Sequence, residues 1–191
     1  WQLSSSAGLP FGDGIAAVYA TDDGLYAVAF AEPSHDLFLL RWPLATLPEG
    51  IATDGELWTA QGWVRAETTA SPAPIARAVS TELSLHWHAP ASCWLMVQTV
   101  GFGAAELAVR TAPTLEGPWS EPVTVFRPEE SDWPDVMVYA GKAHDALATP
   151  VAGELVATYA SNSFDFATLV DDLRLYFPRF VRLRPTSEAA P

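Results

Sequence analysis

The stretch that decides the fold runs from residue 110 to residue 183. Its three apolar runs are RTAPTLEGPWSEPVTVF (residues 110–126), VYAGKAHDALATPVAGELVATYASNS (138–163) and LYFPRFVRL (175–183). In the first run, Pro113 ends an apolar strand because proline cannot donate to a β-ladder. Gly117 and Pro118 then predict a tight turn, after which we expect Trp119 to be buried against the next strand. The stretch therefore predicts β-strands joined by turns.

The same pattern continues toward the N-terminus. Asp23-Gly24 between two apolar runs is a strong hairpin signal, and residues 81–87 (TELSLHW) alternate polar and apolar as a half-buried strand does. Residues 164–173 fit either a short helix or a loop. The predicted strands cover residues 15–19, 25–30, 37–42, 56–58, 62–64, 81–87, 93–99, 106–110, 122–126, 136–139, 144–148, 154–159 and 175–183.

These strands group into about three strand–turn–strand units. Radial repeats of small antiparallel sheets are typical of a β-propeller, and a β-sandwich with a similar number of strands is the alternative. The aromatic content and the repeated turns favour blades, so we predict an all-β fold of the five-bladed propeller type, with about three blades in this chain. Residues 1–184 would form this partial propeller domain, and residues 185–191 a flexible tail.

Charge and composition exclude several classes of partner. The formal net charge is −13, whereas nucleic acids and anionic membranes are bound by Lys/Arg-rich surfaces. No apolar run is long enough to span a bilayer. The single cysteine, Cys93, cannot form an intrachain disulfide and is interpreted as a small buried hydrophobic residue. Because the chain begins at Trp1 rather than at methionine, we expect it to be processed or truncated.

Ten short motifs in a fixed order resemble one family. They are DDGLY (residues 22–26), LFLLRWP (37–43), GELW (55–58), GWV (62–64), ELSLHW (82–87), WLMV (94–97), RTAPTLEGPWS (110–120), YAGKAH (139–144), GELVATYASN (153–162) and YFPRFV (176–181). Their order resembles the C-terminal part of DUF4185-type proteins, five-bladed β-propellers that include endo-acting D-arabinanases. The chain departs from that pattern at Asp145, where the family tends to carry proline.

The resemblance implies a glycoside hydrolase-like protein that acts on a furanose-rich, arabinan-type polysaccharide in a central funnel. It implies a secreted or cell-envelope location and no cofactor. Two further blades that supply acidic residues would come from a second polypeptide or from an N-terminal segment. The alternative is a non-catalytic propeller subunit that binds glycan or protein and completes a partner chain.

Candidate site residues follow from strand alternation and from the resemblance. Glu82 and Ser84 share one face of a predicted strand, as do Lys142 and His144. The resemblance places both segments on the funnel side, with Glu82 and His144 as catalytic candidates. Lys142, Asn162, Ser84 and Gln98 are the substrate-binding candidates. A solvent-facing polar stripe at Glu82 and an ordinary hydrogen-bonded histidine at His144 remain open alternatives.

A histidine pair and a group of acidic residues are weaker candidates for a functional site. His86 and His88 share a strand face, and such a pair can bind a metal, but the sequence offers no third ligand nearby, so we predict no metal site. The acidic residues around Trp133-Pro134 predict a solvated loop or, alternatively, a sugar-stacking platform. They are Glu129, Glu130, Asp132 and Asp135.

Overall fold

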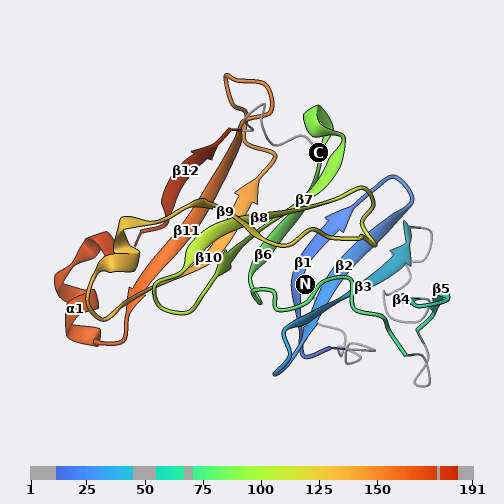
Figure 1. The fold of residues 1–191 in the computed structure, drawn as a ribbon, viewed down its shortest axis with the longest axis horizontal. Helices are drawn as coiled ribbons and strands as arrows, with labels where there is room; N and C mark the ends of the chain where they lie inside the picture. Colours follow the sequence, from blue (N-terminus) through green and yellow to red (C-terminus); the bar gives the residue numbers. More distant parts are fainter. Residues whose placement is uncertain (1–11, 45–54, 67–70, 176, 185–191) are drawn as a thin grey trace, which may run out of the picture. The chain divides into compact units, whose positions relative to one another are not determined.

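The computed structural model describes residues 12–44, 55–66, 71–175 and 177–184. These residues form two compact units that divide between Thr81 and Glu82. Within them, the chain folds into three antiparallel sheets of five, four and three strands, with one short α-helix (Figure 1). The predicted tail at residues 185–191 lies outside the described residues.

The first unit contains the first sheet. Its strands are β1 (Gly14–Ala20), β2 (Gly24–Ala31), β3 (Asp36–Pro43), β4 (Glu56–Thr59) and β5 (Gly62–Arg65), which neighbour one another in chain order. The predicted Asp-Gly hairpin forms between β1 and β2, where Thr21 N donates to Gly24 O over 2.9 Å. Short turns of this kind make sequential strands pair as a meander.

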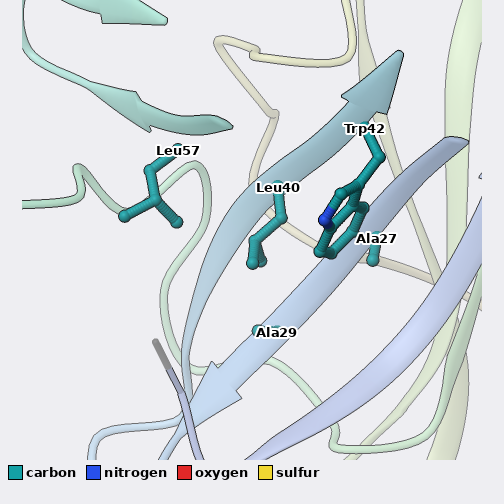
Figure 2. Packing of buried hydrophobic residues seen from close by; sticks show 5 residues of the cluster. All are labelled: Ala27, Ala29, Leu40, Trp42 and Leu57. Carbon is teal, nitrogen blue, oxygen red and sulfur yellow. The ribbon is translucent and has the colours of Figure 1, made fainter. Parts of the chain in front are cut away.

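One face of the first sheet forms an apolar core of Ala27, Ala29, Leu40, Trp42 and Leu57 (Figure 2). The register pairs Ala27 with Leu40 and Leu40 with Leu57, so these side chains project from the same face. All five are less than a tenth exposed. Burial of this apolar surface, rather than a disulfide, holds the sheet together.

The second sheet opens the second unit and contains β6 (Leu83–His88), β7 (Cys93–Val100), β8 (Glu106–Ala112) and β9 (Val123–Phe126). The predicted turn after β8 is confirmed, because Gly117 N donates to Thr114 O over 3.0 Å. Trp119 is half-buried rather than buried. Its indole Nε1 donates to Leu115 O over 3.1 Å, which fixes the ring to the turn.

The third sheet contains β10 (Val136–His144), β11 (Leu155–Ser163) and β12 (Arg179–Leu183). Three shorter elements flank these strands: η3 (Glu129–Asp132), α1 (Phe166–Asp171) and η4 (Leu173–Leu175). The undecided segment 164–173 therefore contains a short helix. Asp165 caps it, accepting from Ala167 N.

The third sheet also corrects two predicted strands. Residues 136–144 form one strand, interrupted by a bulge at Ala140 and Gly141 where Tyr139 pairs with Ala160 and Lys142 with Thr158. The strand predicted at 144–148 does not form, because the chain turns after His144, and Leu147 N donates to His144 O. The third of the predicted strand–turn–strand groups consequently has three strands rather than four. No closed propeller is present among the described residues.

The third sheet packs against the second with one face. That face carries Val138, Ala157 and Tyr159, which join Ala105 and Leu107 in a second apolar core. Figure 1 shows the third sheet, orange to red, beside the green to yellow second sheet. None of the described helices is long and apolar enough to cross a membrane.

Candidate functional site

Strands β6 and β10 lie side by side in the second unit. Ala143 N in β10 donates to Ser84 Oγ in β6 over 2.7 Å. The Asp145 carboxylate, in the turn just after β10, acts electrostatically on His86 in β6. We call this contact between the two strands the β6–β10 seam.

The start of β6 lies close to the middle of β10. Gly141 packs against the backbone of β7, where a Cβ atom would stand 3.0 Å from Gln98 C and 3.1 Å from Thr99 N. Gln98 is the register partner of Leu83, the residue after Glu82. Gly141 therefore packs against β7 at the level of Leu83, the first residue of β6.

Lys142, His144 and Asn162 share one face of the third sheet. Register partners across the sheet form the rows Lys142–Thr158–Phe180 and His144–Val156–Arg182. We call this side the outward face; every residue on it is half-buried or exposed. Its strand positions are Met137, Tyr139, Lys142, His144, Val156, Thr158, Ala160, Asn162, Phe180 and Arg182.

His144 is held in place on this face. Its Nε2 lies 2.8 Å from Thr158 Oγ1, so one ring nitrogen is engaged by the neighbouring strand. The other nitrogen, Nδ1, is the atom that a ligand could use. This geometry fits a histidine that orients a hydroxyl group.

Asn162 and Gln98 lie apart from the seam. Asn162 stands four residues beyond Thr158 on β11, a distance of about 13 Å along a strand, and its Oδ1 accepts from Ser163 N. Gln98 is fully buried, with 0% exposure. The structure thus brings Ser84 to the β10 backbone between Lys142 and His144, and Glu82 is the residue before β6. Asn162 lies further along the sheet face of Lys142 and His144, and Gln98 is enclosed inside the second sheet.

His86 and His88 follow Ser84 at alternate positions of β6 and so lie on the same face of that strand. They are 2% and 5% exposed, and their ring centroids are 6.4 Å apart. Burial lowers the pKa of both imidazoles; for His86, Asp145 opposes this effect and His88 adds to it. Where the structure describes the chain, no three His, Cys, Asp or Glu side chains are arranged to hold a metal ion.

The acidic loop at η3 contains a buried ionic cluster that the sequence pattern did not predict. Glu130 is 1% exposed and accepts from Tyr159 Oη over 2.8 Å, while Arg179 Nε lies 3.0 Å from its other carboxylate oxygen. Burial, followed by the bond to Glu130, raises the pKa of Tyr159 well above its usual range. Glu130 therefore links η3 to β11 and β12 through these two contacts, and it is not part of a solvated loop.

This cluster lines an open cleft of ≈ 610 Å³ between β9, β11 and β12. Arg127 at its edge is already bound to Glu106 and Asp132. Three of the charged residues that line the cleft, Arg127, Glu130 and Arg179, are therefore already in ion pairs. Its lining residues are Phe126, Arg127, Glu129, Glu130, Tyr159, Pro178, Arg179, Phe180 and Val181.

Sequence reasoning also missed Tyr139, Thr158, Phe180 and Arg182 on the outward face. The period-two alternation in RFVRL placed Phe180 and Arg182 on one side of a strand. Which strand they joined, and therefore that they share a face with Lys142, depends on the pairing of β11 with β12.

Comparison with known proteins identifies the family. Residues 6–163 match the family model described as "Domain of unknown function (DUF4185)". One solved structure that resembles the chain is that of a "putative hydrolase" from Bacteroides ovatus, with a TM-score of 0.63 and 18% sequence identity. The match covers 88% of this chain and 44% of that protein, so the chain spans less than half of the protein it resembles. None of the curated proteins compared with the chain matches it. With most of its length matched by that model, the chain belongs to the DUF4185 family.

Proposed function

We propose that this chain is part of a propeller-type glycoside hydrolase that acts on a furanose-rich, arabinan-type polysaccharide. The observation that carries the proposal is the hydrogen bond from Ala143 N to Ser84 Oγ, because it joins the segment that begins with Glu82 to the segment that holds Lys142 and His144. Adjacent first strands of successive sheets, such as β6 and β10, are what the innermost strands of neighbouring propeller blades would be. The fold shared with the putative hydrolase supports this proposal.

The proposed chemistry divides the roles among four residues. Glycoside hydrolysis uses two carboxyl groups on either side of the scissile bond, and Glu82 supplies one of them. His144, held by Thr158, orients a sugar hydroxyl, while Lys142 and Ser84 bind hydroxyl groups beside it. The second carboxyl group and the remaining blades come from a further segment or a partner chain. Because such a polysaccharide lies outside the cytoplasm, the proposal includes a secreted or cell-envelope location.

The test measures turnover of arabino-oligosaccharides by the complete assembly with Glu82→Gln. Loss of a general acid or base slows turnover by at least about 100-fold, so the variant should lose activity while keeping its circular dichroism spectrum. Glu121→Gln, at an exposed position in the second sheet's last turn, is the matched control and should leave turnover unchanged. Undiminished turnover with Glu82→Gln would remove the catalytic role.

The second candidate function is a non-catalytic glycan-binding module. It is favoured by the outward face, whose strand positions supply donor groups and aromatic rings but no carboxylate. Titration calorimetry with the same oligosaccharides separates the two functions. Binding without turnover, together with equal affinity of the wild type and Glu82→Gln, would identify a binding module.

A further inference from the structure

Two exposed phenylalanine rings meet at one end of the second unit. Phe102 lies in the turn between β7 and β8 and is 87% exposed, and Phe164 directly follows β11 and is 65% exposed. Their ring centroids are 6.2 Å apart, and we call the surface that they form the Phe102–Phe164 platform (Figure 1). On a chain with a net charge of −13, an exposed apolar surface built from two separate loops indicates an interaction site.

Backbone hydrogen bonds hold both loops against the start of β10. Val138 N donates to Gly103 O over 3.0 Å, which fixes the turn that carries Phe102. Phe164 N donates to Asp135 O over 3.3 Å, which fixes the loop that carries the second ring. Because the two loops are already ordered, a ligand that binds to the rings loses little free energy to loop ordering.

The platform lies at the end of the second sheet where β6 begins. Leu83, the residue after Glu82, is the register partner of Gln98 in β7. Phe102 is four residues beyond Gln98, which is at most about 13 Å along an extended chain. An oligosaccharide of a few sugar units that occupies the Glu82 end of β6 can therefore reach the platform.

Two polar side chains adjoin Phe164 and suit hydroxyl groups. Asp135, whose backbone has a φ of 57°, is exposed, and its carboxylate pairs with no described residue. Asn162 stands two residues before Phe164, and its Oδ1 accepts from the next backbone amide, so its Nδ2 can donate to a ligand. A sugar ring presents C–H groups on its face and hydroxyl groups at its edge, and such a ligand matches aromatic rings flanked by a carboxylate and an amide.

Charge and size favour a neutral sugar over other occupants. The segments that build this end of the unit contain neither Lys nor Arg, so they would repel an anionic ligand. These segments are residues 99–109, 128–141 and 160–173. Even with Phe166, which is 76% exposed, the three phenylalanines present on the order of 450 Å², against about 800 Å² that each partner buries in a stable protein interface.

We propose that the Phe102–Phe164 platform is a subsite for the neutral polysaccharide, a few sugar units away from Glu82. This inference rests on the proposed function and adds to it a second place where the same substrate is bound. The C–H face of a furanose ring packs on the two phenylalanine rings, while Asp135 accepts from a sugar hydroxyl and Asn162 donates to another.

Titration calorimetry of the intact chain with arabinohexaose tests the platform. We expect Phe102→Ala and Phe164→Ala each to weaken binding at least about fivefold, because each removes apolar contact area. Phe102→Trp keeps an aromatic ring and should bind at least as tightly as the wild type. Val123→Ala, at a 63% exposed apolar position in β9, is the matched control and should leave the affinity unchanged.

Three outcomes would overturn the proposal. They are no hexaose binding by the wild-type chain, equal affinity of the wild type and both alanine variants, and self-association in ultracentrifugation that Phe102→Ala abolishes. The last outcome would identify the platform as a contact between copies of the chain. Turnover that depends on Glu82 would in each case still support the proposed function. Hexaose binding that depends on the platform, without any turnover by the complete assembly, would support the subsite and contradict the hydrolase.

Discussion

His86 and His88 are buried in neutral form on β6. Their pKa values lie below the usual 6.5 because burial disfavours the charged ring. As pH falls through 6.5, the unfolded chain takes up protons at these positions before the folded chain does. We therefore expect the free energy of unfolding to be highest above pH 6.5 and to decrease as pH falls below it.

Urea denaturation at pH 7.5, 6.5 and 5.5 measures this dependence above the range in which most carboxyl groups titrate. His86→Leu should flatten the decrease between pH 7.5 and pH 5.5, because it removes the more deeply buried imidazole. His35→Leu changes a half-buried histidine of the first unit and should leave the decrease in place. Wild-type stability that is constant over this interval would contradict the prediction.

The buried cluster at Glu130 makes a second prediction at the level of single residues. Tyr159→Phe removes the hydroxyl that donates to Glu130 and leaves a buried carboxylate oxygen without that bond. Hydrogen bonds to charged groups contribute about 1.5–3 kcal/mol, so the free energy of unfolding should fall by about that amount. Tyr139→Phe, on the half-buried outward face, should change stability by less than about 0.5 kcal/mol. If urea denaturation gave equal effects for the two substitutions, the hydrogen bond between Tyr159 and Glu130 would not stabilise the fold as predicted.

Among the elements, the approach of β10 to β7 depends on Gly141. A Cβ atom there would meet backbone atoms of Gln98 and Thr99, which cannot rotate away as a side chain can. Gly141→Ala should therefore lower the free energy of unfolding by about 1–3 kcal/mol. The displaced strand would also disturb the bond from Ala143 N to Ser84 Oγ, so the Ala143 amide should exchange faster with deuterium. Unchanged stability and exchange would show that the contact is not tight.

Strand positions followed from period-two alternation and from turn residues, since both act over a few residues of chain. Thus 83–88, 93–100 and 106–112 form strands close to the predicted limits. The alternation at Val136–Tyr139 breaks at Ala140 and Gly141, so the sequence predicts two strands there. The structure has a single strand with a bulge at these two residues. A bulge is defined by the register with the partner strand, and the residues of a single strand do not show which strand that is.

At the scale of the whole molecule, charge determines solution behaviour. The net charge is −13 at pH 7 and the isoelectric point is ≈ 4.5. Mutual repulsion between molecules vanishes near that pH, while Phe102 and Phe166 are 87% and 76% exposed. We expect solubility to pass through a minimum near pH 4.5 and to be high at pH 7.5, as turbidity at low ionic strength would show. A minimum at another pH would mean that the folded charge differs from the formal charge.

The amino-acid sequence alone was sufficient for the β class, the acidic character and the pairing of Lys142 with His144 on one strand face, because composition and alternation are local properties. The predicted propeller ring stays a prediction, since the described chain forms sheets of five, four and three strands without closure. The seam between Ser84 and Ala143, the burial of Glu130 and the placement of Phe180 in the same cross-strand row as Lys142 came from the folded molecule. These features bring together residues far apart in the chain, and the packing of one sheet on another decides such contacts.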